Sequence, residues 1–383
     1  MGQTNRLRLG ILFNISPNWL GGVYYIINLI NALNALDEAD QPEIFVFYSK
    51  NLEKFTHQIE YTHLSLIQWD FDSPLKGYLK SWLTRRNTFS NDIVKQFDLD
   101  AIYPERHQPL PVKKAYDQKV KSVSVFLDLQ HKYYPEFFSK RQLFLRELRL
   151  KLILKHTNDL VVSSAVTRED FKKFYSLRED LNIHVLNFVS IIDDFDFDGI
   201  ETLREKYRLP DHYFMISNQF HNHKNHRILL EALAELKQRG KSVHLAITGK
   251  MPQDDSPYLK TLYDLIDKYE LDEHISFLGV IPRQEQLTLM KFSKAVIQPS
   301  LFEGWSTVIE DAKSLQVPVI ASNLDVNIEQ LKDQGTYFDP HNAKELADIL
   351  TNYKTNGKAL LYQDYQSRVK GFAQNFTQIF KTN

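Results

Sequence analysis

The chain has 383 residues, of which 43% are hydrophobic and 25% charged, and its net charge is -1. This balance is typical of a globular protein with a real core, and the length suggests two domains. The near-neutral charge argues against strong nonspecific binding to nucleic acids. Cysteine is absent, which excludes disulfides and thiolate metal sites and agrees with a reducing compartment.

The amino terminus is polar and leads directly into a short strand-like run, without the long apolar core of a signal peptide. No stretch of the sequence approaches the roughly 18 apolar residues that a membrane span needs. We therefore expect a cytoplasmic protein, and we keep peripheral contact with the inner membrane face as a hypothesis.

Short apolar runs alternate with helical patterns along the whole chain. The strand-like runs are 8–14, 43–48, 100–103, 122–127, 159–163, 213–217, 244–248, 275–277, 295–298 and 318–321. The helical patterns include 23–36, 225–238, 256–270, 283–292 and 306–316. Such alternation predicts an α/β fold in which helices cover both faces of parallel sheets.

The rhythm restarts after about residue 190, which predicts two doubly wound, Rossmann-like domains of residues 1–190 and 191–383. A last helix at about 363–381 is expected to cross back to the first domain. Open parallel sheets bind ligands at the carboxyl ends of their strands, so the loops that follow strands are the place to look for chemistry.

The most informative loop follows the strand at 295–298 and runs from Pro299 to Ala312. Ser306 is a candidate N-cap for the helix that follows. At about 100° per residue, Glu310 lies nearly opposite the apolar face of that helix, so we expect it to point at solvent or a cleft. The unpaired N–H groups of a helix start suit a pyrophosphate, and Gly304 would permit close approach. An ordinary surface helix after a Glu-Gly turn is the alternative.

This run resembles the Glu-x7-Glu signature of retaining GT-B glycosyltransferases of family 4, including the following Pro-Val-Ile-Ala strand at 318–321. The resemblance implies two Rossmann-like domains facing across a cleft, a nucleotide-sugar donor and no metal. It implies that Glu303 touches the transferred sugar and that Glu310 holds the ribose hydroxyls. The resemblance also implies that the sugar and diphosphate are bound by the backbone of Gly304, Trp305, Ser306 and Thr307.

A second polar loop, residues 217–225, lies between a strand and a helix. The family resemblance aligns Lys224 with a lysine that neutralises the leaving diphosphate, a form of electrostatic preorganisation. Gln219 stands where the family has an arginine, so one positive charge of the expected phosphate clamp is missing. Arg227 or Arg283 would have to supply that charge. A basic loop with a solvated lysine is the alternative.

Other features of the second half follow the family's order of elements but are generic. They are Gly249 and Lys250 after one strand, and Gly279 near the expected nucleobase pocket. Three histidines, His221, His223 and His226, have spacing that zinc can use, but no cysteine or well-placed carboxylate completes such a site. We therefore expect no metal.

The first half contributes two candidate features on the acceptor side. Gly21 and Gly22, at a strand-to-helix turn, resemble the family's glycine-rich first loop, although a plain tight turn explains them equally well. Asp128 follows the strand at 122–127, where the family often has His-Asp, but Leu127 replaces the histidine and His131 sits three residues on. Asp128 or His131 would orient an acceptor hydroxyl, or Asp128 simply caps a turn.

An acidic segment lies at the expected domain boundary. Asp194, Asp196, Asp198, Gly199 and Glu205 satisfy the spacing of an EF-hand calcium loop. The segment before them resembles a strand and hinge instead of an entering helix, so an acidic interdomain linker is the better interpretation.

The charge is unevenly distributed between the halves. Residues 1–190 carry 25 Lys and Arg against 21 Asp and Glu, while residues 191–383 carry 22 against 27. Basic residues interleave with apolar ones at 76–86 and 137–156, a pattern that can hold a protein on an anionic membrane. An amphipathic helix with a solvated basic face is the alternative.

Taken with the resemblance, these features predict transfer of a hexose from a UDP- or GDP-sugar to a hydroxyl with retention. The acceptor would be a saccharide or a lipid-linked saccharide, in assembly of a cell-surface polysaccharide or glycolipid. Two alternatives remain: a nucleotide-sugar epimerase on the same fold, and a nucleotide-sugar-binding protein without catalysis.

Overall fold

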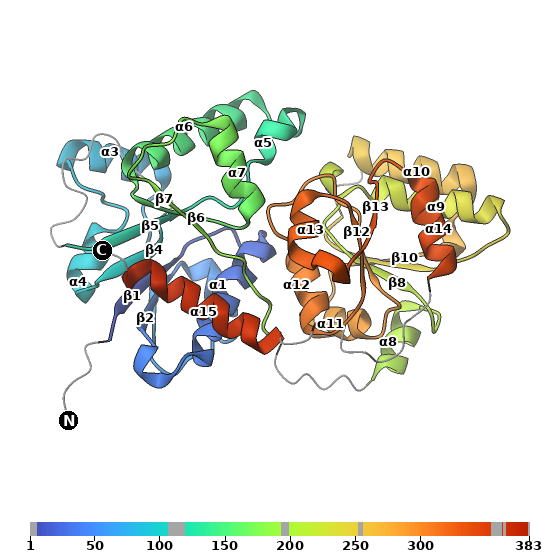
Figure 1. Ribbon diagram of the computed structural model, residues 1–383, viewed down its shortest axis with the longest axis horizontal. Helices are drawn as coiled ribbons and strands as arrows, with labels where there is room; N and C mark the ends of the chain where they lie inside the picture. Colours follow the sequence, from blue (N-terminus) through green and yellow to red (C-terminus); the bar gives the residue numbers. More distant parts are fainter. Residues whose placement is uncertain are drawn as a thin grey trace. The chain divides into compact units, whose positions relative to one another are not determined.

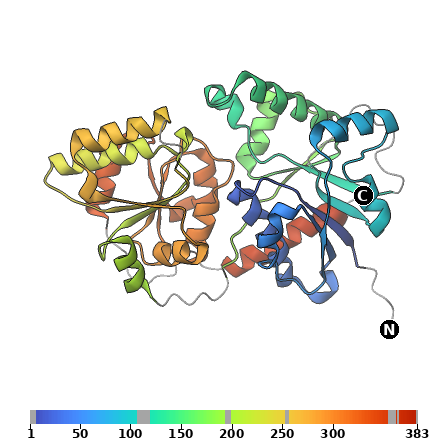
Figure 2. The same ribbon diagram turned by 180° about the vertical axis from the view of Figure 1, so that it is seen from behind.

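The computed structural model describes residues 6–105, 119–192, 199–251, 256–353, 362 and 365–381. The chain divides into two compact units, the first made of residues 1–191 and 366–383 and the second of residues 192–365. In each unit the described residues form a parallel sheet with helices packed on its two faces (Figures 1 and 2). The predicted α/β class with two doubly wound sheets is therefore confirmed.

The described part of the first unit holds a seven-stranded sheet in the order β3-β2-β1-β4-β5-β6-β7. Its strands are β1 (Arg8–Phe13), β2 (Glu43–Tyr48), β3 (Leu64–Gln68), β4 (Ala101–Glu105), β5 (Lys121–Val125), β6 (Asp159–Val162) and β7 (Asn182–Val185). Its helices are α1 (Leu20–Ala32), α2 (Glu53–Thr56), α3 (Pro74–Thr84), α4 (Asn91–Phe97), α5 (Gln130–Tyr133), α6 (Lys140–His156), α7 (Ala165–Phe174) and α15 (Tyr365–Lys381). Strands β1 and β4 are almost wholly buried, as expected for central strands of a sheet covered on both faces.

The described part of the second unit holds a six-stranded sheet in the order β10-β9-β8-β11-β12-β13. Its strands are β8 (Phe214–Ser217), β9 (Leu245–Thr248), β10 (Ile275–Gly279), β11 (Val296–Gln298), β12 (Val319–Ser322) and β13 (Thr336–Phe338). Its helices are α8 (Ile200–Tyr207), α9 (His226–Gln238), α10 (Pro257–Tyr269), α11 (Arg283–Lys291), α12 (Thr307–Ser314), α13 (Asp325–Leu331) and α14 (Ala343–Asn352).

Successive residues of the second sheet's strands face opposite helix layers, because side chains alternate along a strand. Ile216 and Ile297 enter one core cluster with residues of α9, α10 and α14. Met215 and Val296, their neighbours, enter another cluster with residues of α11 and α12. This two-sided burial fixes the register of the strands, and with it the positions of the loops at their carboxyl ends.

Some elements differ from the sequence-based expectation. Strands β3 and β13 and helices α13 and α14 were not expected, and α1 begins at Leu20, three residues before the predicted start. Gly21 and Gly22 therefore lie in the first helical turn, and not in a turn that precedes the helix. Asp194, Asp196 and Asp198 of the calcium-loop pattern lie outside the described residues.

The last helix, α15, packs on the first unit (Figure 1). The ring of Phe376 meets that of Tyr103 on β4 edge to face, with 5.2 Å between centroids. Lys370 and Lys381 pair with Asp37 and Asp40 at 3.2 and 2.8 Å. Such exposed pairs add little, so aromatic burial supplies most of the attachment.

Truncating the buried ring should show how strongly α15 stabilises the first unit. We expect Phe376→Ala to cost about 3–5 kcal/mol, the usual range for a buried Phe in a core. Hydrogen exchange should then accelerate in β1 and β4, but not in β8 or β11 of the second unit. Asn375→Ala, on the exposed side of α15, is the matched control. Equal acceleration in both sheets would contradict this account.

Candidate active site

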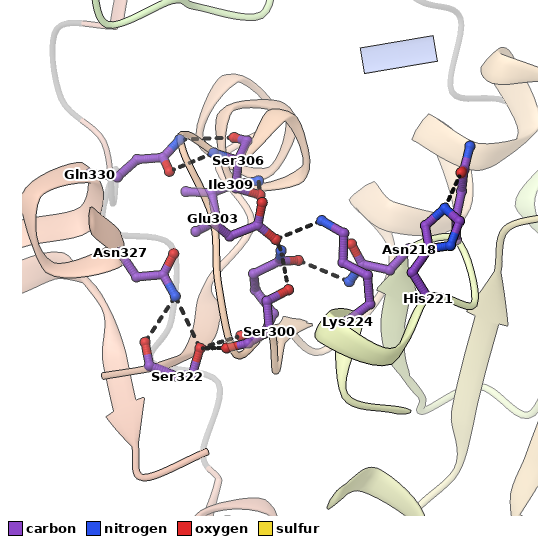
Figure 3. A network of polar contacts seen from close by, with 12 residues as sticks. Asn218, His221, Lys224, Ser300, Glu303, Ser306, Ile309, Ser322, Asn327 and Gln330 are labelled. Carbon is purple, nitrogen blue, oxygen red and sulfur yellow. Dashed lines mark hydrogen bonds and ion pairs between the residues drawn. The ribbon is translucent and has the colours of Figure 1, made fainter. Parts of the chain in front are cut away.

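The loops at the carboxyl edge of the second sheet bring together residues that are far apart in the sequence. Glu303, after β11, accepts a hydrogen bond from the Lys224 ammonium at 2.6 Å and another from the Gln298 amide at 2.7 Å (Figure 3). Both partners of the ion pair are largely buried. The structure thus places the predicted Glu303 and Lys224 in direct contact, with a charge-assisted bond between them.

Gln298, at the end of β11, organises this contact and was not singled out by the sequence. It is fully buried. Its amide nitrogen reaches Glu303 and Ser300, while its oxygen accepts from the Asn218 amide at 3.0 Å. A buried amide with donors and acceptors satisfied fixes its neighbours in one arrangement, so Gln298 holds the Glu303 carboxylate in place.

The loop that carries Lys224 is shaped by Asn225, which adopts a left-handed conformation with φ of 53°. The Asn225 amide donates to the backbone oxygens of Pro299 and Pro340 at 3.1 and 2.9 Å. Asparagine tolerates this conformation better than most residues. The Lys224 loop is thereby tied to the loop that follows β11.

The start of α12 has the cap that the sequence predicts. Ser306 accepts a hydrogen bond from the Ile309 backbone N–H at 3.3 Å, and its own backbone N–H and C=O are both bonded by the Gln330 amide (Figure 3). Trp305 is buried, and Gly304 precedes it. The positive end of the helix dipole lies at this first turn, which includes Thr307, and can receive an anion.

Glu310 does not point at solvent or a cleft, so that prediction is wrong. Its side chain is 0% exposed. The carboxylate accepts from Lys313 at 3.3 Å, from the Gln330 amide at 2.9 Å and from the Tyr365 hydroxyl at 2.9 Å. Helix α12 is covered on this side by α13 and by Tyr365 as well as on its sheet side, and a helical pattern cannot show a second covering layer.

The spacing also moves the second signature position by one residue. Six residues separate Glu303 from Glu310, whereas Asp311 lies eight positions after Glu303, as a Glu-x7-Glu spacing requires. Asp311 forms a two-pronged ion pair with Arg283 at the start of α11, at 2.5 and 2.7 Å. Gln286, one turn further along α11, bonds Ser217 at the end of β8, so this pair lies near the carboxyl edge of the sheet.

Neither arginine proposed to replace the family's cation is free. Arg227 is exposed on α9 and pairs with Glu231 at 2.7 Å, whereas Arg283 is held by Asp311. The side-chain oxygen of Gln219 accepts a hydrogen bond from the His221 ring at 3.0 Å. Of the two arginines, Arg283 is the one placed at the sheet edge.

Glycines shape the neighbouring loops. Gly249 has a φ of 150°, and a Cβ there would lie 2.1 Å from the Asn218 backbone oxygen, so only glycine fits. Its N–H donates to the Gly279 oxygen at 2.9 Å, which joins the ends of β9 and β10. Lys250 is exposed beside this junction. Gly279 itself has open space around it and a φ of 66°.

The three histidines do not converge. The rings of His221 and His223 stack at 5.7 Å, while the buried ring of His226 stacks on Phe220 at 4.2 Å. Among the described residues, no three His, Asp or Glu side chains gather as metal ligands would. Burial, with a smaller contribution from the Lys224 charge, lowers the pKa of His226 to about 3, so this ring is neutral.

Of the two acceptor-side glycines, Gly22 lines a pocket in the first unit and Gly21 does not. This pocket has about 350 Å³ and is lined by apolar residues together with Asp128 and two arginines. A Cβ at Gly22 would lie 2.4 Å from the Trp19 ring, which folds over the helix start. Gly22 therefore makes room for Trp19, which shares the lining of the pocket.

Asp128 and His131 occupy different environments. Asp128 lines this pocket, accepts from the Gln130 N–H at 3.1 Å and pairs with Arg146 at 3.1 Å. His131 is buried, contacts Glu147 at 2.9 Å, and has its pKa lowered by burial and by the Arg146 charge. This placement gives Asp128 access to a ligand in the pocket and does not support His131 in that role.

A larger pocket of about 740 Å³ opens at the carboxyl ends of β1, β2 and β3. Its lining is mostly polar, with Trp69 and Phe71 as aromatic surfaces, and it ends at Pro74, the first residue of α3. Sequence reasoning missed it because β3 was not expected. An aromatic face beside hydroxyls, amides and carboxylates can hold a polar ligand such as a saccharide.

The buried Glu310–Lys313 pair gives a stability prediction. Glu310→Ala should destabilise the protein by about 3–5 kcal/mol, because Lys313 would keep a buried, unpaired charge. Adding Lys313→Met should recover much of the loss. Glu231→Ala, which breaks the exposed pair with Arg227, should cost under about 0.5 kcal/mol. Denaturant unfolding measures all four proteins, and an unchanged Glu310→Ala would refute the burial.

His226 gives a pH prediction. Because its pKa is about 3 in the folded protein and about 6.5 when unfolded, only the unfolded chain takes up a proton between these values. The contribution of His226 to stability is therefore full above pH 6.5 and falls by about 2 kcal/mol by pH 5. His226→Phe should remove this loss, and the exposed His212→Phe should not. Thermal unfolding between pH 5 and 7 tests the difference.

Residues 199–370 match the family model described as "Glycosyl transferases group 1". These residues include the Lys224 loop, the loop with Glu303 and the first turn of α12. The match therefore covers both loops that form the Lys224–Glu303 contact.

Two curated relatives are mannosyltransferases. The O-antigen chain mannosyltransferase RfbU of Salmonella typhimurium is 22% identical over 281 residues, which cover 73% of this chain and 70% of RfbU. The serotype-specific mannosyltransferase WbdA of Escherichia coli is 25% identical over 168 residues, 43% of this chain. Those residues are 20% of WbdA, so the matching region spans about a fifth of that relative.

The fold resembles that of HepE from Anabaena in complex with UDP, with a TM-score of 0.66, 18% identity and coverage of 98% of this chain and 100% of the other. A likeness at this identity concerns the fold alone. The comparisons thus confirm that the chain resembles glycosyltransferases with the GT-B fold, and that its residues 199–370 match the glycosyl transferases group 1 family.

Proposed function

We propose that this protein is a retaining glycosyltransferase that moves a hexose from a UDP- or GDP-sugar to a hydroxyl acceptor. The observation that carries this proposal is the Lys224–Glu303 contact at the carboxyl edge of a sheet whose sequence matches the glycosyl transferases group 1 family. A carboxylate for the sugar, an ammonium for the diphosphate and a helix start lie together there. These are the groups that the departure of a nucleoside diphosphate requires.

Each part of the donor has a proposed partner in the second unit. Glu303 contacts the transferred sugar, and Lys224 with the first N–H groups of α12 balances the diphosphate charge without a metal ion. Asp311 takes the ribose role that the sequence assigned to Glu310, because its spacing fits and its partner, Arg283, lies at the sheet edge. Both carboxylates are buried, but the partners of Glu310 are on the far side of the helix from that edge. As the bond to the sugar breaks, the leaving phosphate oxygen accepts the proton of the attacking hydroxyl.

The acceptor is proposed to bind to the first unit, in the pocket that contains Gly22 and Asp128. Two mannosyltransferase relatives, one of which acts on O-antigen chains, support assembly of a cell-surface polysaccharide or glycolipid. We propose that the protein works in the cytoplasm, in peripheral contact with the membrane. The chain contains no cysteine, which agrees with that compartment.

The reaction is tested by incubating the protein separately with UDP-glucose, UDP-N-acetylglucosamine and GDP-mannose. Slow release of free sugar and nucleoside diphosphate supports transfer, and the anomer first formed, followed by NMR, reports retention. Interconversion of the intact nucleotide sugars would favour an epimerase. Binding without turnover would favour a protein that only binds the donor.

Substitutions assign the roles. Glu303→Gln and Lys224→Met should each lower turnover by about 10²-fold, the usual effect of losing a preorganised electrostatic group. Asp311→Asn should weaken nucleotide binding about tenfold, while Glu310→Gln should change it less than threefold, since Glu310 lies behind the site. Lys241→Met, at an exposed turn, is the control for Lys224→Met. A larger effect from Glu310→Gln than from Asp311→Asn would restore the original assignment.

A further inference from the structure

Helix α3 in the first unit buries its small residues and exposes its large apolar ones, the reverse of what is usual in a globular protein. Its buried face is made of Gly77 and Ser81, and a Cβ at Gly77 would lie 2.2 Å from the ring of Phe89. Its large apolar side chains point outward: Leu75, Leu79, Trp82 and Leu83 are 51–83% exposed. Their spacing of four, three and one residues puts them on one face of the helix.

Helix α6 adds a second exposed apolar face. Phe144, Leu145 and Leu148 are 40–66% exposed, although Leu150 and Ile153 of the same helix are buried in the core. The Arg149 guanidinium of α6 also acts on α3: burial raises the pKa of the Tyr78 hydroxyl, and the guanidinium charge opposes this rise. Figures 1 and 2 show α3 beyond one end of α6, along the same border of the unit.

Exposed cations accompany these apolar side chains. On α6 they are Lys140, Arg141, Lys151 and Lys155, and at the end of α3 they are Arg85 and Arg86. The one carboxylate of α6, Glu147, is engaged by His131 and Lys132 and does not offset them. Asp72 pairs with Lys76 and Lys80 and lowers the net charge near the start of α3.

We propose that the outward faces of α3 and α6 form a surface that binds an anionic lipid bilayer. This α3–α6 surface consists of Leu75, Leu79, Trp82, Leu83, Phe144, Leu145 and Leu148. Leucines and a tryptophan enter the boundary between headgroups and acyl chains, while the surrounding Lys and Arg side chains contact lipid phosphates. Within the ranges that the structure describes, every helix is too short or too polar to span a bilayer.

Charge complementarity favours lipid over a protein partner. The cations lie at both ends of α6 and at the end of α3, around the apolar side chains, as a uniformly anionic surface requires. Trp82, with the Arg85 guanidinium 6.0 Å from its ring, has the amphipathic character that suits a membrane interface.

The position of this surface gives it a consequence for the acceptor. The larger pocket of the unit ends at Ser73 and Pro74, where α3 begins, and the smaller pocket is lined by Arg146 and Arg149 of α6. Both pockets therefore adjoin helices of the α3–α6 surface. An acceptor carried on a membrane lipid would reach these pockets without leaving the bilayer, a corollary that rests on the proposed transferase activity. Membrane binding itself does not depend on that activity.

The test is co-sedimentation of the full-length protein with vesicles of phosphatidylglycerol and phosphatidylcholine, and of phosphatidylcholine alone. We expect binding to the anionic vesicles that weakens at least tenfold between 50 and 500 mM salt, and little binding to the neutral ones. Leu79→Ser with Leu83→Ser should weaken binding to anionic vesicles at least tenfold. Both side chains are exposed, so the fold should survive, which circular dichroism checks.

Two control variants complete the test. Tyr263→Ser removes an exposed aromatic side chain on α10 of the second unit and should leave vesicle binding unchanged. Lys151→Glu with Lys155→Glu should weaken binding without altering the apolar residues. Absence of vesicle binding, or equal binding by all variants, would overturn the proposal. So would a wild-type dimer, seen by sedimentation velocity without lipid, that the Leu79→Ser and Leu83→Ser variant dissociates.

Hydrolysis of the nucleotide sugar in solution separates this proposal from the transferase proposal. The leucine variant should hydrolyse donor at the wild-type rate, because the substituted side chains are in the other unit from the donor residues. Loss of vesicle binding with intact hydrolysis supports the membrane surface alone. Vesicle binding by a protein that turns over no donor would refute the transferase and leave the surface standing.

Discussion

The contact between Lys224 and Glu303 exists because parallel strands end at a common edge of their sheet. Strands β8 and β11 are neighbours in the second sheet, so the loops that follow them meet although 79 positions separate the two residues. The buried amide of Gln298, at the end of β11, then donates a hydrogen bond that holds the Glu303 carboxylate in place. The polar end of this unit is therefore a consequence of its apolar strands, whose two-sided burial permits no slip in register.

On helix α12, two neighbouring acidic residues have different surroundings. Glu310, in the first turn of α12, and Asp311, the next residue, are adjacent carboxylates, and both are paired. Adjacent helical positions differ by about 100°, so only one of them can face the covering layer of α13 and Tyr365. Glu310 has that position and its partners are internal. Asp311 instead pairs with Arg283 at the sheet edge, and this position is the basis of the ribose role proposed for it.

Much of this arrangement follows from the sequence. The strands around the site are continuous apolar runs such as Val296–Gln298, and their ends could be predicted closely because turn residues follow them. Ser306 was predictable as an N-cap because it directly precedes a run with helical periodicity. The burial of Glu310 was not, since it depends on α13 and on Tyr365, which is 55 residues away. Strand β3 has partly exposed alternating residues, and β13 has only three, so neither carries a strong local pattern.

The outward face of α3 is another feature that the local sequence pattern does not predict. Here apolar residues are exposed, whereas at Glu310 a charged residue is buried. A sequence with leucines at helical spacing predicts that the leucines face the core, because burial is what such spacing usually achieves. In α3 the neighbouring ring of Phe89 requires a residue without a side chain, and Gly77 supplies it, so the small face turns inward. The leucines then have nowhere in the described unit to be buried. Exposed apolar area of this extent is costly in water unless another apolar phase covers it, and the basic residues around it are the reason for proposing an anionic bilayer as that phase.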